Sequence, residues 1–495
     1  MRGIYTPVTK IRRQVFAHIA KFAYDGEDYD KIEQIPYEII PGEVPTYRES
    51  VFKERAIIGE RLRLAAGLPM RKPDEHCALS KGLEDMAVAK RIDYKDELVN
   101  VISFACMACP TKSYMVTDNC RGCLAHPCTS ACPVMAVSII GGKSYIDKEK
   151  CIKCGRCKKS CPYNAIISYD RPCAAACGVD AIESDHIDRA VINHEKCVSC
   201  GQCIVKCPFG AISDKSEIVQ VITAIKQEKK VCAAIAPAFA GQFGPLATPD
   251  KIKEAFKKLG FYDVVEVALG ADIGAVAEAH HFAQSVPEKQ PFLATSCCPS
   301  WKDLAQKFFP TIKDYVSDSD TPMIETAKAI KSRDKDALVV FVGPCVAKKL
   351  EARKENVRGY VDFVLTFEEV MGMFTAKDVQ FDEIEDKMPL ADASVDGRGY
   401  AVAGGVASAI EHNIKEIYPK KEIKIDRADG LSECRKMLML AKAGKKNGHL
   451  LEGMACPGGC IGGPGAIMPI DKAQIEVKKY KEQSPYDVAV KNPMV

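Results

Sequence analysis

The chain has 495 residues, of which 47% are apolar and 27% are charged, and its 69 basic and 66 acidic residues leave a net charge of only +3. This length exceeds what a single hydrophobic core usually needs, so we expect roughly two to four domains. The near-neutral charge gives no support for nucleic acid or an anionic membrane as a partner. No apolar run could cross a bilayer, and the N-terminus lacks the apolar core of a signal peptide, so we expect a cytoplasmic protein without a membrane partner.

Residues 1–100 are charged, and stretches such as FKERAIIGERLRLAAGL place apolar residues at helical spacing. We predict a mainly helical N-terminal section there, without an assigned function. Residues 101–215 hold most of the cysteines and form the second predicted region. Residues 216–495 form the third, in which apolar β-type runs such as VCAAIAPAF and ALVVFVGPC alternate with helical patterns. That alternation predicts α/β units with buried parallel strands, and ligands bind at the carboxyl ends of such strands.

The 24 cysteines are the most unusual feature of the composition. Disulfides are unfavoured in a reducing compartment, so metal binding is the leading interpretation. CIKCGRCKKSCP at 151–162 and CVSCGQCIVKCP at 197–208 each reproduce the C-x2-C-x2-C-x3-C-P run of bacterial ferredoxins. Three thiolates of such a run bind one [4Fe–4S] cluster and the fourth reaches its neighbour. A zinc site would not require the Cys-Pro ending.

CRGCLAHPCTSACP at 120–133 is the same run with two residues inserted. If it pairs with the run at 151–161, the crossing rule gives two clusters. The first would be bound by Cys120, Cys123, Cys128 and Cys161, and the second by Cys151, Cys154, Cys157 and Cys132.

PCAAACGVDAI at 172–182 has the spacing of a partner run that lacks its first two cysteines. By the same rule, a third cluster would be bound by Cys177, Cys197, Cys200 and Cys203. Cys173 and Cys207 then need two more ligands, and ACMACP offers Cys106 and Cys109 as the unassigned close pair. We therefore predict four [4Fe–4S] clusters, at least three of them from intact spacing. The alternative is that Cys106 and Cys109 bind elsewhere or are free.

Three further cysteine segments, TSCCPSW (295–301), GPCVAKKLE (343–351) and EGMACPGGCIGGPG (452–465), match in order and spacing the signatures of [FeFe] hydrogenases. The chain resembles that family over roughly residues 100–495. The resemblance implies an α/β catalytic domain of two parallel-sheet lobes flanked by helices, preceded by ferredoxin-like α+β cluster domains. It also implies an H-cluster, which is a [4Fe–4S] cubane joined to a di-iron unit that carries carbonyl, cyanide and an azadithiolate.

Residue roles follow from the resemblance. The cubane ligands would be Cys298, Cys345, Cys456 and Cys460, with Cys460 bridging to the di-iron unit. Four glycines of the last segment would let the backbone approach the cluster. Contacts to the di-iron unit would come from Lys348, Met454, Ala236 and Pro237. Cys297 would be the first proton carrier, and Ser317 and Glu351 later ones.

Some positions depart from the family pattern. Gly343-Pro344-Cys345 stands where Met-Pro-Cys is usual, and Ala238 where a serine is usual. By alignment the relay glutamate after Cys297 is Ala277, so Glu278, His280 or water would have to replace it. These changes resemble the group B branch of the family. Cys77, Cys232 and Cys434 fit no motif, and we expect ordinary reduced thiols there.

The resemblance implies an oxidoreductase that interconverts H2 with protons and electrons, exchanges electrons with ferredoxin or a similar carrier, and needs maturation enzymes. Two alternatives remain open at this point. One is an H2- or redox-sensory protein of low turnover, since the proton relay is altered. The other is an iron–sulfur electron-transfer or assembly protein without the di-iron unit.

Overall fold

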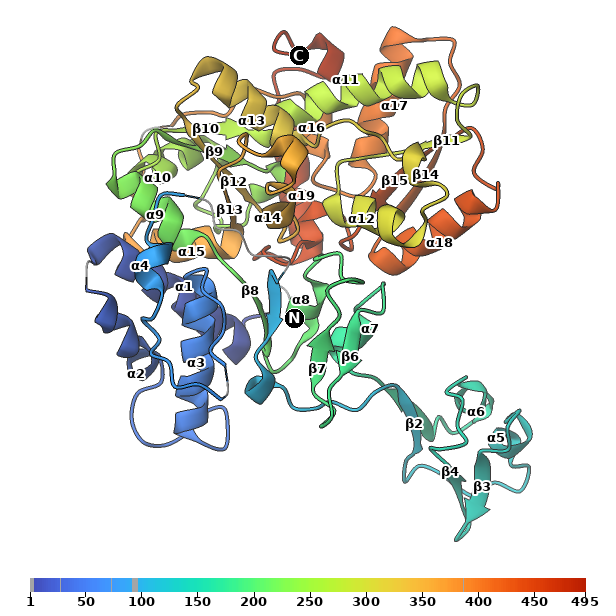
Figure 1. Ribbon diagram of the computed structural model, residues 1–495. Coiled ribbons are helices and arrows are strands. Elements are labelled where there is room, and N and C mark those ends of the chain that lie inside the picture. The colour runs from blue at the N-terminus through green and yellow to red at the C-terminus, as the bar shows by residue number, and fades with distance from the viewer. Residues whose placement is uncertain (1–3, 27, 73, 91–96, 386) are drawn as a thin grey trace.

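The computed structural model describes residues 4–26, 28–72, 74–90, 97–385 and 387–495. Figure 1 shows an α/β body at the top, a helical N-terminal section below it on the left, and a small cluster-type module that projects at the lower right. The predicted fold class, an α/β catalytic domain with ferredoxin-like domains and a helical N-terminus, is confirmed. Within the described residues, no helix is long and apolar enough to span a membrane.

The α/β body contains two parallel sheets. The larger has the strand order β10 (Asp263–Glu266), β9 (Val231–Ile235), β12 (Leu338–Gly343) and β13 (Phe363–Thr366). The smaller has the order β11 (Phe292–Ala294), β15 (His449–Met454) and β14 (Lys424–Asp429). The predicted parallel strands at VCAAI and LVVFVG are confirmed, and both are buried along nearly their whole length, as expected of strands covered on two faces.

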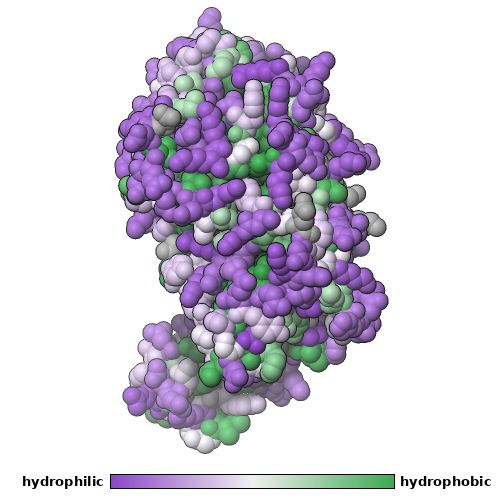
Figure 2. Space-filling view, turned by 90° about the vertical axis from the view of Figure 1, so that its left-hand side faces the viewer, coloured by the Kyte–Doolittle hydropathy of each residue, from purple (hydrophilic) through white to green (hydrophobic). Residues whose placement is uncertain are grey.

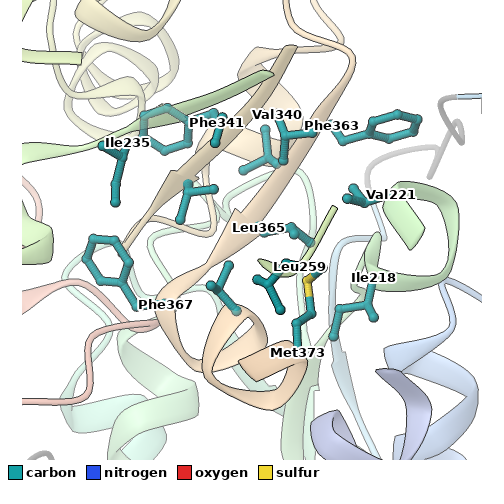
Figure 3. Close-up of a cluster of buried hydrophobic side chains, with 14 of the residues drawn as sticks. Ile218, Val221, Ile235, Leu259, Val340, Phe341, Phe363, Leu365, Phe367 and Met373 are labelled. Atoms are coloured by element: carbon teal, nitrogen blue, oxygen red, sulfur yellow. The ribbon is translucent and has the colours of Figure 1, made fainter. Parts of the chain in front are cut away.

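Helices cover both sheets. Those of the larger lobe are α9 (Ile218–Lys226), α10 (Ile252–Lys258), α13 (Pro322–Arg333) and α15 (Phe367–Ala376). Those of the smaller lobe are α12 (Pro299–Phe308), α17 (Gly405–Ile417) and α18 (Leu431–Lys442). Between and around the lobes lie α11 (Val267–Ser285), α14 (Lys348–Glu351), α16 (Val395–Gly399) and α19 (Ile470–Glu482). Figure 3 shows how side chains of β12, β13, α9 and α15 meet in the core of the larger lobe.

The helical N-terminal section consists of α1 (Pro7–Asp25), α2 (Ile35–Ile39), α3 (Val51–Ala65) and α4 (Leu83–Met86). It shares one hydrophobic core with the larger lobe, where α1 packs against α15 and α9. Arg12 pairs with Glu368 at 2.7 Å across that contact. The section is therefore packed against the α/β body. The predicted region 1–100 also includes positions 1–3, 27, 73 and 91–96, which lie outside the described residues.

The cysteine-rich region forms two ferredoxin-like units. The inner unit contains β6 (Ile182–Ser184), β7 (Ala190–Ile192), α7 (Pro172–Ala175) and α8 (Gln202–Lys206), with β1 (Val99–Val101) paired to β8 (Ile212–Asp214) beside it. The outer unit contains β2 (Ser113–Val116), α5 (Pro127–Ser130), β3 (Val137–Ile140), β4 (Lys143–Ile146), α6 (Arg156–Ser160) and β5 (Ile166–Tyr169). Strands β2 and β5 pair antiparallel and connect the outer unit to the body.

Candidate functional site

Four loops converge where strands of both sheets end. The segment APAF follows β9 and GPC follows β12 in the larger sheet, while TSCCP follows β11 and ACPGGC follows β15 in the smaller. Carboxyl ends of parallel strands form the ligand edge of an α/β sheet. The structure brings the predicted residues of these loops around one cavity, whose lining includes Cys297, Cys298, Cys345, Cys456, Cys460, Lys348, Met454, Ala236 and Pro237.

The lining of this cavity fits an iron–sulfur group. Four of its thiols can supply the ligands of a [4Fe–4S] cluster, and the lining adds a fifth thiol and one amine. The remaining surface is apolar, and Met323 and Phe341 contribute to it. A Cβ at Gly343 would lie 2.6 Å from the Phe341 ring, so this ring occupies space next to the position where the family pattern has a methionine. Neither Met323 nor Phe341 belongs to a cysteine motif, which is why sequence reasoning missed them.

Cys297 and Cys298 diverge, as expected for neighbouring residues in extended backbone. Cys298 is the N-cap residue of α12, with Pro299 at the first helical position, and packs against the cores on both sides. Cys297 packs only against the core formed by α11 and α17. Burial, reinforced by the neighbouring Cys298 and Glu278, raises the pKa of the Cys297 thiol well above its usual value. Cys297 is therefore a neutral thiol that holds its proton beside a carboxyl group.

Glu278 on α11 is that carboxyl group. It is only 3% exposed, and its Oε1 accepts hydrogen bonds from Ser296 N at 3.0 Å and Ser296 Oγ at 3.1 Å. Burial raises the pKa of Glu278, and hydrogen bonds from Ser296 and Ser317 oppose that rise. Ala277, which the sequence alignment put in the relay position, is exposed. The sequence alignment left no glutamate next to Cys297, because it put Ala277 in that position. Glu278, the next residue of α11, points inward and supplies the carboxyl group instead.

The other relay candidates occupy different places. Ser317 is fully buried and bonds to Glu278. The adjacent Asp318 is 97% exposed, and its Oδ1 lies 3.9 Å from Nδ1 of His281, one turn beyond Glu278 on α11. His280 instead bonds to the Tyr418 hydroxyl at 2.7 Å. Glu278 and Ser317 are thus buried together near Cys297, and Asp318, the residue after Ser317, lies at the surface beside His281.

Glu351, expected in the proton relay, forms an ion pair with Lys348 at 2.5 Å. Burial alone would lower the pKa of Lys348, but the carboxylate of Glu351 outweighs it and raises that pKa. Lys348 Nζ also donates to the Cys297 carbonyl at 3.4 Å. Glu351 thus keeps a buried lysine charged at the cavity wall, and the carboxylate next to the Cys297 thiol is Glu278.

Tyr400 adds a polar group that no motif indicated. Its ring lines the cavity, and its hydroxyl is buried without a hydrogen-bond partner among the described residues. Burial, followed by the nearby Glu278 carboxylate, raises the pKa of Tyr400 well above its usual value. An unpaired buried hydroxyl costs roughly 1–3 kcal/mol, so a group bound in the cavity is the natural acceptor for this donor.

The cysteines of the inner unit gather around two further cavities. One is lined by Cys177, Cys197, Cys200 and Cys203, and the other by Cys106, Cys109, Cys173 and Cys207. These are the two sets that the crossing rule proposed, with Cys106 and Cys109 beside Cys173 and Cys207. Cys200 interacts electrostatically with Cys298, and Cys203 with Cys173. The two sets therefore lie in series beside the main cavity.

The cysteines of the outer unit are also grouped. Cys157 interacts with Cys151, Cys132 and Cys154, which is the predicted second set. Within the predicted first set, Cys120 and Cys128 both contact Ser144, at 3.5 and 3.2 Å. Cys161 packs in the same small core as Cys128, and Cys123 is half-buried. Among the described residues no cluster of His, Cys, Asp and Glu is arranged to hold a single metal ion.

The three cysteines outside the motifs lie apart from these cavities. Cys232 is buried on β9, Cys434 is buried on α18, and Cys77 is half-buried in the N-terminal section. The Cys434 thiol donates to the Met454 carbonyl at 3.4 Å. None of the 24 cysteines forms a disulfide.

The fold and the grouped thiols define an iron–sulfur protein, and similarity to known proteins specifies the class. Residues 229–464 match the C-terminal domain of the iron-only hydrogenase large subunit, and residues 144–167 and 190–213 match the 4Fe–4S binding domain. The chain therefore contains a region similar to the C-terminal domain of the iron-only hydrogenase large subunit, together with 4Fe–4S binding domains.

Individual relatives are distant. Iron hydrogenase 1 of Clostridium pasteurianum is 29% identical over 69% of this chain and 68% of its own length. A cytosolic Fe–S cluster assembly factor of Aedes aegypti is 25% identical over 46% of this chain and 58% of its own. A solved [FeFe]-hydrogenase from Chlamydomonas reinhardtii has 21% identity and a TM-score of 0.45, covering 56% of this chain and 92% of that one.

Proposed function

We propose that this protein is a ferredoxin-linked [FeFe] hydrogenase that interconverts H2 with two protons and two electrons at an H-cluster. The carrying observation is that Cys298, Cys345, Cys456 and Cys460 line one buried cavity together with Cys297 and Lys348. A cubane alone requires four thiolates. The fifth thiol, the buried lysine and the unpaired Tyr400 hydroxyl exceed that requirement, and they support a larger group in the same cavity.

The residues that would hold the H-cluster are those of the lining. Cys298, Cys345, Cys456 and Cys460 are the proposed ligands of its cubane. Lys348 and the Tyr400 hydroxyl are suited to donate hydrogen bonds to anionic or electron-rich ligands of the di-iron unit. Met454, Met323 and Phe341 would exclude water from it. When bound, the H-cluster supplies the open iron position at which H2 is formed or split.

The protons would travel along the side chains that begin at Cys297. The thiol holds one proton at Sγ, passes it to or takes it from the Glu278 carboxylate, and Ser317 links Glu278 to the surface. Asp318 and His281 would exchange protons with solvent. Burial raises the pKa of Glu278, which favours proton uptake by this carboxylate, so Glu278 is suited to accept a proton and return it.

The electrons would travel through four accessory [4Fe–4S] clusters held by the grouped cysteines. The set with Cys177 and Cys197 is nearest the H-cluster site, the set with Cys106 and Cys173 is next, and the two sets of the outer unit are the most distant. We propose a ferredoxin or a similar one-electron protein as the external carrier, maturation enzymes as the source of the di-iron unit, and the cytoplasm as the location.

We also propose membership of the group B branch. Gly343 in place of methionine and Ala238 in place of serine support it. Ala238 lines the cavity, and Gly343 lies next to the ring of Phe341, which also lines it. The buried Cys297–Glu278–Ser317 series supports turnover rather than a purely sensory role, since a proton route serves catalysis.

One relative is described as an Fe–S cluster assembly factor, which makes assembly the second candidate function. The two candidate functions differ in whether they require a route for proton transfer. An assembly protein has no use for a buried thiol and carboxylate in series, whereas a hydrogenase cannot turn over without them.

The test is H2 evolution by anaerobically matured protein, driven by a reduced dye. Cys297→Ala should lower the rate by about 100-fold or more, because it removes the first proton carrier. Cys232→Ala is the matched control, because Cys232 is a buried thiol on β9 outside the cavity lining, and this variant should keep most of the activity. Absence of H2 evolution in matured wild type, or equal rates in wild type and Cys297→Ala, would refute the proposal.

A further inference from the structure

The two intact ferredoxin runs have the same cysteine spacing but opposite surroundings. In the inner run, Val198, Ser199, Gln202 and Ile204 are all buried. Gln202 Nε2 donates to the Gly462 carbonyl at 3.2 Å, and a Cβ at Gly201 would lie 2.7 Å from Pro464. This face of the inner run is thus pressed against the loop that carries Cys460. It is a contact surface between the inner unit and a loop of the proposed H-cluster site.

The same face of the outer run is exposed and basic. Ile152, Lys153, Arg156 and Lys158 replace those four residues, and Ile152 is 59% exposed. From position 148 to 159 the chain has six basic residues and one acidic residue, although the whole protein carries only +3. Among the described residues, Lys153, Arg156 and Lys159 form no ion pair.

Cys154 lies in the middle of this segment and is the one exposed cysteine among the 24. The segment belongs to the projecting outer unit, which forms a small separate lobe below the main body in Figure 2 and is farthest from the catalytic body in Figure 1. A cluster bound there would be the one nearest to solvent, and electron transfer between proteins requires such proximity.

We infer that this basic face, defined by Lys148, Lys150, Ile152, Lys153, Arg156 and Lys159, is the docking surface for an acidic electron-carrier protein that bears an iron–sulfur cluster. The inference rests on the proposed function and specifies its partner. The external carrier would contact the outer run in the same way that the Cys460 loop contacts the inner run. Positive charge would steer an acidic partner to the face, and Ile152 would supply the apolar centre of the contact.

The partner that docks on this face is a protein rather than a nucleic acid, because the basic residues surround Cys154, a proposed cluster ligand, and the exposed Ile152. A second copy of this chain is a weaker match, since the remainder of the molecule has almost balanced charge. Charge complementarity of this kind mainly accelerates association and makes binding sensitive to salt.

The test compares two triple variants of the full-length matured protein. Lys153→Glu/Arg156→Glu/Lys159→Glu reverses the basic face. Lys335→Glu/Lys420→Glu/Lys445→Glu makes the same change of net charge at exposed positions of the catalytic body. Iron content and the electron paramagnetic resonance of the accessory clusters establish that both variants keep their clusters.

The probe is an acidic bacterial ferredoxin with two [4Fe–4S] clusters, and its dissociation constant is measured by calorimetry at low and high ionic strength. The face variant should bind at least about tenfold more weakly at low salt and lose most of the salt dependence. The control variant should bind within about twofold of wild type.

Equal affinity of the face variant and wild type overturns the inference, and so does equal weakening in the control variant. Tighter binding of wild type to DNA or RNA than to the ferredoxin overturns it as well, as does self-association that the face variant abolishes. Binding does not depend on H2 turnover. A protein that binds the ferredoxin through this face but evolves no H2 would refute the proposed function alone.

Discussion

Whether a carboxylate lies near the Cys297 thiol depends on which of two adjacent residues of α11, Ala277 or Glu278, faces inward. Neighbouring positions of an α-helix differ by about 100° in direction, so Ala277 and Glu278 cannot face the same side. Glu278 is buried against Ser296 and Ala277 is exposed. Motif spacing predicted the cysteines, because each ferredoxin-type run and each signature segment carries them at fixed short intervals. It could not choose between two adjacent positions of a helix far from those cysteines.

The same limit applies to the other residues of the cavity. Phe341, Met323 and Tyr400 reach the lining from three separate segments, and no local spacing connects them. Glu351 was expected in the proton relay, but it pairs with Lys348. The sequence does not show that the Glu351 side chain turns back toward the amine one helical turn earlier. A sequence shows the spacing of residues along the chain, but it does not show the direction in which a side chain points in the folded site.

We expect Glu278→Gln to lower H2 evolution by about 100-fold, because an amide cannot take up the proton released by the thiol. The H-cluster should still assemble, since Glu278 is not among the proposed ligands. Ala277→Gln, the exposed neighbour, should retain wild-type rates. Stopped-flow or dye-coupled assays with infrared detection of the cluster give both readouts. A full rate in Glu278→Gln would show that protons leave Cys297 by another route.

At the scale of elements, strands were the more predictable part. Buried strands such as β9 and β12 are continuous apolar runs followed by Pro, Gly or Cys, and their ends hold the site as expected. Helix α3 was predicted from its apolar spacing, but nearly its whole circumference is buried, including Glu54, Glu60 and Arg61. Glu54, for example, accepts a backbone hydrogen bond from Arg48 at 2.6 Å. Hydrogen-bonding groups on other segments make the burial of these charged side chains possible. The apolar spacing of the helix does not predict them.

Two glycines of α11 give a matched pair of stability predictions. A Cβ at Gly270 would lie 2.2 Å from the Pro322 carbonyl oxygen, whereas a Cβ at Gly274 meets no atom within 4 Å. Gly270→Ala should therefore destabilise the protein by about 1–3 kcal/mol by separating α11 from α13. Gly274→Ala should stabilise it by roughly 0.5–1 kcal/mol through helix propensity. Urea unfolding monitored by circular dichroism measures both, and shifts of the same sign would contradict the packing of these helices.

Asp272, also on α11, predicts a pH dependence of stability. Burial raises its pKa to about 6, although Ser394 and Asn492 donate hydrogen bonds to it. The folded state thus binds this proton more tightly than the unfolded state does. The stabilising contribution is complete below about pH 4 and is lost as the pH rises through about 6, which amounts to about 3 kcal/mol.

Asp272→Asn should remove this part of the pH profile, because the side chain no longer titrates. The comparison is made between wild type and variant, both without clusters, by urea unfolding from pH 4 to 7. Parallel profiles for the two proteins would mean that Asp272 does not bind the proton in the folded state.

For the whole molecule, composition and cysteine spacing predicted three kinds of region but not their arrangement. The α1 helix shares a core with α15, which lies more than three hundred residues later, and no sequence pattern predicts that contact. The outer unit projects on the β2–β5 pair while the inner unit is packed against the catalytic loops. This arrangement orders the thiol groups from an exposed end to the buried cavity, which is the geometry that electron delivery requires.

The most direct test of the central claim is infrared spectroscopy of the anaerobically matured protein. Carbonyl and cyanide stretching bands report the di-iron unit itself, independently of turnover and of the accessory clusters. We predict these bands in wild type and their loss in Cys460→Ala, with the iron of the accessory clusters retained. A wild-type protein with fully loaded [4Fe–4S] clusters but no such bands would contradict the account.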